Sequence, residues 1–336
     1  MDHKIKTIGI LTSGGDAPGM NAAVRAVTRT ALFNGINVKG IYKGFNGLMS
    51  GNMKNLTLRD VSGILERGGT CLYSARCPEF NSDEGVEKGK LACQKAGIDA
   101  LVVCGGDGSF RGARDLSLKG VPCIGIPCTI DNDIAATEYS IGYDTAINTV
   151  VKNIDKLRDT SQSHDRCSVV EVMGRNCGDI ALRSAICDGA VSFLVPEIEY
   201  DLERDIINKM RTTLGTGKSH FIVIVAEGVT QADPKFEGDE PMDAARIAAY
   251  IQEKTGVEAR ATVIGHVQRG GSPSARDRVI ASEMGHYAVE LLMKGIGNRI
   301  VTRQGSTTTD VDILEGLKME KTIDINLVRV ANEISI

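Results

Sequence analysis

Short runs of apolar, mostly β-branched residues end directly in glycine-rich or polar turns, and this repeated feature limits the fold more than any other in the sequence. Unbroken apolar runs of this length are typical of strands that are buried on both faces of a sheet. The runs expected to form central strands are Thr7–Leu11, Ala100–Val103, Cys123–Ile126, Ser168–Val172 and Phe221–Ala226.

Segments with helical spacing of their apolar residues alternate with these runs. Helices are expected at Asn21–Asn34, Asp144–Asp159 and Ser282–Met293. A repeated order of strand, glycine turn and helix predicts a doubly wound α/β sheet, in which ligands bind beyond the carboxyl ends of the strands. With 336 residues, the chain has room for about two such domains. The polar segment 230–243 is expected to be a surface loop.

Composition excludes several classes of protein. The 39 basic and 43 acidic residues give a net charge of −4, which provides no broad basic surface for nucleic acid. The apolar runs are far shorter than the ~20 residues that cross a bilayer, and the N-terminus lacks the apolar core of a signal peptide. The nine cysteines are scattered without a CxxC pair, which favours neither a disulfide framework nor a zinc site. We therefore expect a cytoplasmic protein with no nucleic-acid or membrane partner.

The glycine-rich turn Gly105–Ser109 follows one expected strand and precedes a helical pattern. Glycines let backbone N–H groups approach phosphate oxygens, and a carboxylate such as Asp107 can hold Mg²⁺ through water. The same residues also suit a tight strand-to-helix turn without a ligand, so this motif alone leaves both interpretations open. The turn Thr12–Gly19 is a second, weaker candidate of the same kind.

The segment Thr129–Asp133 places two carboxylates just after another expected strand. Like charges this close are unfavourable unless a metal, a cation or a proton compensates one of them. Asp131 is therefore a candidate general base, with Asp133 oriented towards a metal or the backbone. A simple Asx-type turn is the alternative.

Arginines lie in or beside the turns expected at strand ends, namely Arg76, Arg166, Arg175, Arg260 and Arg269. The planar guanidinium group binds phosphate through two parallel hydrogen bonds. Each arginine alone is more often a solvated surface charge. Together with the glycine-rich and acidic turns, they predict one phosphoryl-transfer site.

These residues lie in stretches that closely resemble the bacterial-type ATP-dependent 6-phosphofructokinases, and the resemblance runs nearly end to end. The stretches that carry it are LTSGGDAPGMNAAVRAV, ERGGTCLYSARCPEF, ALVVCGGDGSFRGA, TIDNDI, IGYDTAINTVV, SVVEVMGRNCGDIAL, ATVIGHVQRGGSP and the C-terminal TIDINLVRVANEISI.

The resemblance implies two doubly wound α/β domains per subunit, with the active site in the cleft between them. Residues 1–142 plus about 273–308 would bind ATP, and residues 143–272 plus about 309–336 would bind fructose 6-phosphate. The implied reaction transfers the γ-phosphoryl group of ATP to the 1-hydroxyl of fructose 6-phosphate, with Mg²⁺ as cofactor. A homo-oligomer, usually a tetramer, is implied, with active sites shared between subunits.

The resemblance also implies roles for individual residues. Asp131 would be the base for the hydroxyl group, Arg175 and Thr129 would assist the transfer, and Asp107 would serve Mg²⁺. The implied ATP-binding residues are Gly15, Arg76, Cys77, Gly106, Asp107, Gly108 and Ser109. The implied substrate-binding residues are Thr129, Ile130, Asp131, Arg166, Met173, Gly174, Arg175, Glu227, Arg260, His266, Val267, Gln268 and Arg269. Of these, Arg166 and Arg260 match positions that reach the sugar phosphate from a neighbouring subunit.

Two positions bear on the phosphoryl donor. ATP-using members of the family commonly have glycine where this chain has Cys128, and pyrophosphate-using relatives tend to have lysine there. The same relatives have aspartate where this chain has Gly108, and that carboxylate would crowd and repel the α-phosphate of ATP. The resemblance therefore favours ATP. A pyrophosphate-dependent enzyme and a catalytically silent regulatory paralogue are the alternatives.

Regulation is the second point on which the chain departs from the family. Arg25, Arg29, Arg158 and Lys218 match basic residues that bind an allosteric effector between subunits. A metal-holding glutamate of that pocket is replaced by Val191, and basic residues are replaced by Leu58, Thr216 and Ser219. Control by ADP or phosphoenolpyruvate is therefore expected to be weak.

Overall fold

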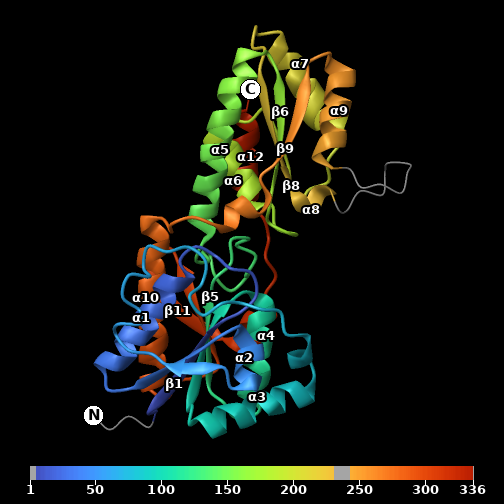
Figure 1. Cartoon of the computed structure of the whole chain (residues 1–336). Coiled ribbons are helices and arrows are strands. Elements are labelled where there is room, and N and C mark those ends of the chain that lie inside the picture. The colour runs from blue at the N-terminus through green and yellow to red at the C-terminus, as the bar shows by residue number, and fades with distance from the viewer. Residues whose placement is uncertain (1–4, 231–242, 336) are drawn as a thin grey trace. The chain divides into compact units, whose positions relative to one another are not determined.

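The expected strands form two separate sheets in a computed structural model that describes residues 5–230 and 243–335 (Figure 1). Most of the surface loop expected at 230–243 lies outside the described residues. The chain divides into two compact units. Unit 1 comprises Met1–Ile130, Ile134–Thr145 and Arg269–Lys321, and unit 2 comprises Asp131–Asp133, Ala146–Gln268 and Thr322–Ile336. No described helix has both the length and the apolar character needed to cross a membrane.

Unit 1 contains a seven-stranded sheet whose central strands are parallel. In spatial order the strands are β11 (Thr307–Asp312), β10 (Arg299–Gln304), β5 (Cys123–Pro127), β4 (Ala100–Gly105), β1 (Thr7–Thr12), β2 (Asn37–Ile41) and β3 (Met53–Asn55). Only the two edge strands, β11 and β3, are antiparallel to their neighbours. Because β4 and β5 are buried along their whole length, apolar residues are required at every position of both strands.

Helices cover both faces of this sheet. Figure 1 shows α1 and α10 on one face and α2, α3 and α4 on the other. The helices and helical turns of unit 1 are α1 (Met20–Phe33), α2 (Gly44–Ser50), η1 (Pro78–Asn81), α3 (Asp83–Ala96), α4 (Asp107–Leu118), α10 (Ala275–Met293) and α11 (Ile313–Gly316). Helix α10 packs closely on α1 at Gly285. A Cβ atom there would lie only 2.7 Å from the Cβ atom of Ala26, so the close approach requires glycine.

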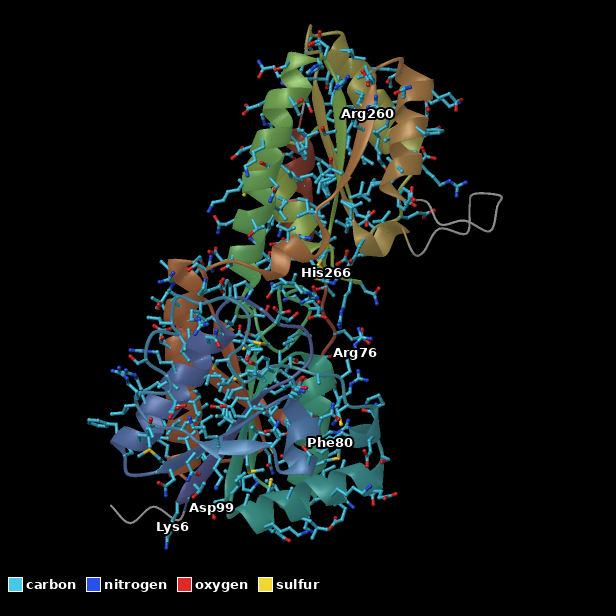
Figure 2. The ribbon with its side chains drawn as sticks, viewed as in Figure 1. Lys6, Arg76, Phe80, Asp99, Arg260 and His266 are labelled. Carbon is cyan, nitrogen blue, oxygen red and sulfur yellow. The ribbon has the colours of Figure 1, made fainter. Side chains whose placement is uncertain are left out.

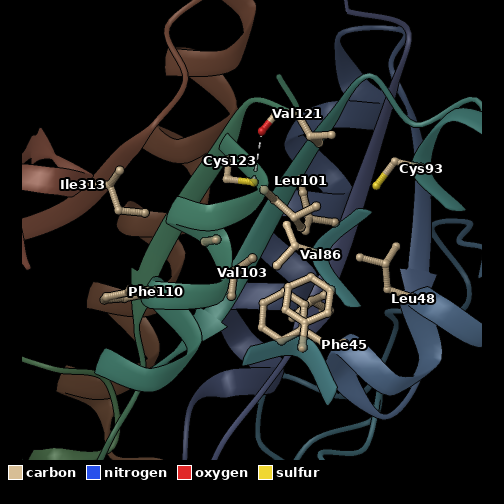
Figure 3. Packing of buried hydrophobic residues seen from close by; sticks show 14 of the residues in the cluster. Phe45, Leu48, Val86, Cys93, Leu101, Val103, Phe110, Val121, Cys123 and Ile313 are labelled. Carbon is tan, nitrogen blue, oxygen red and sulfur yellow. Dashed lines mark hydrogen bonds between the residues drawn. The ribbon is translucent and has the colours of Figure 1, made fainter. Parts of the chain in front are cut away.

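The core beneath α2, α3 and α4 is aromatic at its centre (Figure 3). The rings of Phe45 and Phe80 stack with centroids 4.1 Å apart. Phe110 of α4 is fully buried beside β5, where a side chain at Gly125 would collide with its ring. This packing fixes the start of α4 relative to the ends of β4 and β5.

Unit 2 contains a four-stranded sheet in which all strands are parallel. The strands in spatial order are β7 (Ser192–Leu194), β8 (Phe221–Ala226), β6 (Cys167–Val172) and β9 (Ala259–Val263). The helical segments are α5 (Tyr143–Ser163, in unit 2 from Ala146), α6 (Asp179–Asp188), η2 (Glu203–Ile207), α7 (Asn208–Leu214), α8 (Glu227–Thr230), α9 (Ala244–Thr255), η3 (Gly265–Arg269) and α12 (Ile325–Glu333). Figure 1 shows α5, α6 and α12 on one face of the sheet and α7 and α9 on the other.

The prediction of an α/β fold built on largely parallel sheets is confirmed. All five expected strands are present as β1, β4, β5, β6 and β8. The helix expected at Ser282–Met293 begins earlier, at Ala275, because the side chain of Ser274 accepts a hydrogen bond from the Asp277 amide and caps the first turn.

Candidate functional site

The carboxyl ends of β1, β4 and β5 lie side by side in unit 1, and each is followed by one of the expected ligand-binding turns. Gly106 caps the start of α4 and lies next to Thr129, since a Cβ atom at Gly106 would be 3.9 Å from that of Thr129. A Cβ atom at Gly105 would be 2.5 Å from the Ser109 hydroxyl oxygen and 2.7 Å from the Ser13 carbonyl oxygen. Glycine is therefore required where these turns meet, and the exposed N-terminus of α4 suits an anion.

Asp107 is the first residue of α4 and is half-buried. Burial raises the pKa of its carboxyl group, and the nearby Arg111 opposes the shift. No cluster of three or more His, Cys, Asp or Glu side chains suited to a metal ion occurs among the described residues. Mg²⁺ often binds through only one or two carboxylates and completes its shell with water and phosphate oxygens. Asp107 fits that mode of binding.

Arg269 and the segment around Arg76 meet at the end of β1. Arg269 Nη1 donates to the carbonyl of Asp16 at 3.2 Å, and a Cβ atom at Gly15 would lie 2.8 Å from the same nitrogen. The Ser74 hydroxyl donates to the Gly14 carbonyl, which ties the Arg76 segment to this turn. Arg76 itself is exposed (Figure 2), and Cys77 beside it is half-buried. The structure thus brings Gly15 and Arg269 together and ties the segment that carries Arg76 to the same turn.

A buried carboxylate holds the chain that follows Thr129. Asp277 of α10 accepts hydrogen bonds from the Tyr139 hydroxyl at 2.6 Å and from the amides of Gly142 and Thr145 at 2.8 and 2.9 Å. The Ser140 hydroxyl in this loop donates to the Thr129 carbonyl at 2.7 Å. Sequence reasoning did not identify Asp277, because its partners lie more than 130 residues away in the chain.

Asp131 and Arg175 meet in unit 2. Asp131 is only 2% exposed, and its Oδ2 lies 3.4 Å from Arg175 Nε. Arg175 adopts a left-handed backbone conformation with φ of 55°. The amides of Gly174 and Arg175 donate to Glu227 Oε1 at 3.1 and 2.7 Å. Glu227 therefore holds the turn that carries Arg175.

Arg166 and Arg260 lie at the other end of the unit 2 sheet from Arg175. Both residues are at the amino ends of parallel strands, where Glu258 bridges them with contacts of 2.8 Å to Arg166 and 2.6 Å to Arg260. Arg175 and Glu227 follow the carboxyl ends of the same sheet. A six-residue strand separates the two ends by roughly 17–20 Å. Figure 2 shows Arg260 on β9 and His266 in the turn that follows this strand.

The helical turn η3 presents its residues in different directions. His266 and Val267 are exposed, and Met173 after β6 is half-buried. Gln268 is fully buried, and its Nε2 donates to the Gly265 carbonyl at 3.1 Å. The Gln268 side chain is therefore held within its own helical turn.

The expected effector residues form one pair of cations in each unit. Arg25 and Arg29 are one turn apart on α1, and burial together with Arg29 lowers the pKa of Arg25. In unit 2, burial and the nearby Arg158 lower the pKa of Lys218. Val191 is buried at 1% exposure and Leu58 is exposed at 56%.

Asp188, at the end of α6, is a buried carboxylate that sequence reasoning did not identify. It is 6% exposed, and neither carboxylate oxygen has a hydrogen-bond partner among the described residues. Arg158 donates to the backbone carbonyl of Asp188 rather than to its side chain. Burial raises the pKa of Asp188 to about 7, with a further increase from Asp155 and an opposing effect of Arg158.

Asp188→Asn should increase stability more at pH 7 than at pH 5. The pKa of Asp188 is higher in the folded than in the unfolded chain, so its contribution is most favourable at low pH and is lost as the pH rises to about 7. Each pH unit in this range changes the free energy of unfolding by about 1.4 kcal/mol, or roughly 2–3 kcal/mol between pH 5 and 7. Urea unfolding across this range measures the effect, with Asp159→Asn on the exposed side of α5 as the control. Parallel pH curves for wild type and Asp188→Asn would contradict it.

Comparisons with known proteins identify similar sequences and folds. A family model described as Phosphofructokinase matches residues 7–292. The chain is 51% identical to an ATP-dependent 6-phosphofructokinase of Bacillus velezensis and 52% identical to that of Bacillus pumilus, covering 99% of this chain and 100% of each relative. A phosphofructokinase structure from Saccharomyces cerevisiae matches with a TM-score of 0.86 and 32% identity over 98% of this chain and 48% of the yeast chain, so this chain spans about half of it. A pyrophosphate-dependent phosphofructokinase structure from Marinobacter aquaeolei shares the fold, with a TM-score of 0.83 and 20% identity over 96% of this chain and 86% of that chain.

Proposed function

This chain belongs to the phosphofructokinase family, and from that premise we propose how its residues carry out the reaction. It is a kinase that transfers the γ-phosphoryl group of ATP to the 1-hydroxyl of fructose 6-phosphate and releases fructose 1,6-bisphosphate and ADP. The observation that carries this conclusion is the identity of about half of all positions, over the full length of both chains, with ATP-dependent enzymes.

ATP binds across the turns at the carboxyl ends of β1, β4 and β5 in this proposal. The residues assigned to it are Gly15, Arg76, Cys77, Gly106, Asp107, Gly108 and Ser109. Asp107 would hold Mg²⁺ together with water and phosphate oxygens, and the bound ion would neutralise negative charge on the transferring group. The N-terminus of α4 and the arginines near β1 support binding of the phosphates.

Transfer to the sugar depends on Asp131, Arg175 and Thr129. Asp131 accepts the proton of the 1-hydroxyl, which turns that oxygen into a better nucleophile. Arg175 neutralises charge that develops on the phosphoryl group, and Thr129 helps to hold that group. The contact between Arg175 and Asp131 supports this assignment. The intact set of Asp107, Asp131 and Arg175 argues against a catalytically silent paralogue.

Arg166 and Arg260 complete the sugar-phosphate pocket of a neighbouring subunit in this proposal. Their distance from Arg175 along the unit 2 sheet supports it, because one small sugar phosphate does not extend from one end of a strand to the other. The enzyme would then act as a homo-oligomer, with a tetramer as the proposed form.

Gly108→Asp tests the choice of donor. A Cβ atom at Gly108 has no neighbour within 4 Å, so the carboxylate fits at the start of α4 and its effect would come from repulsion of the ATP phosphates. We expect kcat/KM for ATP to fall by about 10–100-fold, which corresponds to about 1.4–2.7 kcal/mol. Gly108→Asn is the matched control, because it has the same shape without the charge and should lose much less. Unchanged use of ATP by Gly108→Asp would contradict the placement of ATP at this turn.

A further inference from the structure

The three residues Asp131–Asp133 belong to unit 2, although Ile130 before them and Ile134 after them belong to unit 1. A hydrogen bond from Asn132 ties these three residues to the rest of unit 2. Asn132 Nδ2 donates to Asp179 Oδ2 at 2.8 Å, and the two residues are 2% and 8% exposed. A hydrogen bond to a charged acceptor is stronger than a neutral one, and burial shields it from competing water.

The backbone at Asn132 has a left-handed conformation, which asparagine tolerates well. Its φ is 52°, in the left-handed region that asparagine adopts more readily than most residues other than glycine. Asparagine at this position thus permits the left-handed turn, and its side chain bonds the turn to Asp179.

Asp179 is itself well held. It is the first residue of α6, where the positive end of the helix dipole favours a carboxylate. The amide of Gly178 before it donates to Glu197 Oε1 at 2.7 Å, and Asp179 Oδ1 lies 3.5 Å from Arg183 Nε. The acceptor for Asn132 is therefore fixed to the start of a helix.

The segment that carries Asp179 also carries Arg175, four residues earlier. Arg175 Nε approaches Asp131 Oδ2 at 3.4 Å, while Asp179 holds the next residue of the chain, Asn132. The segment from the end of β6 to the start of α6 therefore acts on Asp131 in two ways. Arg175 contacts the Asp131 carboxylate, and Asp179 holds the neighbouring residue Asn132.

We propose that Asn132 and Asp179 are positioning residues that fix the Asp131 carboxylate for proton transfer. This inference rests on the proposed role of Asp131 as the base. A catalytic group displaced by about 1 Å loses on the order of 10²-fold in rate, whereas binding groups elsewhere are unaffected. Loss of the pair should therefore lower kcat and leave KM for fructose 6-phosphate nearly unchanged.

Variants on both sides of the hydrogen bond test the proposal. Asp179→Ala and Asn132→Gly should each lower kcat by about 10–100-fold, and the double variant should lose little more than either single one. Asn132→Gly keeps the left-handed turn accessible, so its effect reports on the lost hydrogen bond. Asp179→Asn should recover most of the activity, because its amide oxygen still accepts from Asn132. Ser184→Ala is a control at another buried position of α6 and should remain active.

The outcomes separate this inference from the proposed function. If Asp131→Ser is inactive while Asp179→Ala and Asn132→Gly, shown by urea unfolding to be folded, keep wild-type kcat, the positioning role is wrong and the base assignment stands. If Asp131→Ser remains active, Asp131 is not the base, and the positioning role proposed for Asn132 and Asp179 fails with it. A rise in KM for fructose 6-phosphate without a fall in kcat would also overturn the positioning role.

Discussion

Asp131→Ser is expected to lower kcat by about 10²–10⁴-fold, the usual range for the loss of a general base. Serine cannot accept the proton of the sugar hydroxyl at neutral pH. The arginines proposed to hold the sugar phosphate remain, so binding of fructose 6-phosphate should change little. Arg175, 3.4 Å from the lost carboxylate, keeps its backbone contacts to Glu227 and hence its place in the turn.

Steady-state rates together with calorimetric titration of fructose 6-phosphate measure the two effects separately. The wild type and Ser184→Ala serve as references, since Ser184 lies on α6 outside the proposed site. Near-normal turnover in Asp131→Ser would show that another group accepts the proton. A loss of sugar binding equal to the loss of rate would assign Asp131 to binding instead of catalysis.

Mixed oligomers of Asp131→Ser and Arg260→Ser subunits should regain activity that neither variant has alone. The reason is the position of Arg260 at the amino end of β9, paired with Glu258 and 70% exposed, far along the sheet from Arg175. If Arg260 serves a neighbouring subunit, a mixed pair has one site with both an intact Asp131 and an intact Arg260. Random assembly of equal amounts makes about a quarter of all sites complete.

The experiment requires refolding of equal mixtures and separation of the mixed oligomers by a charge tag on one variant. Arg329→Ser provides a matched control, because Arg329 is an exposed, ion-paired arginine of unit 2 and should remain active when substituted. Verified mixed oligomers without recovered activity would mean that Arg260 acts within its own subunit or has no contact with substrate.

The strands and the glycine-rich turns could be predicted because their signals are local. An apolar run such as Phe221–Ala226 is typical of a strand buried on both faces, and all six of its residues are buried. The turn Gly105–Ser109 is recognised from its glycines, which stand between an apolar run and a helical pattern.

Other parts of the site depend on residues that are distant in the sequence. Asn132 and Asp179 are 47 positions apart, and nothing around Asp179 indicates its partner. Strand β9 (Ala259–Val263) was not among the expected strands, because most of its residues are exposed and its sequence has no continuous apolar run. The burial of Asp188 follows from the packing of unit 2 and has no local pattern.

The central claim is best tested by following the labelled phosphoryl group. Purified protein is incubated with Mg²⁺, fructose 6-phosphate and either ATP labelled at the γ-phosphate or labelled pyrophosphate. We predict that label from ATP appears on the 1-position of fructose 1,6-bisphosphate with one ADP formed per product, and that pyrophosphate gives far less. Transfer from pyrophosphate at a rate equal to or above that from ATP, or no transfer from either donor, would contradict the function proposed for this chain.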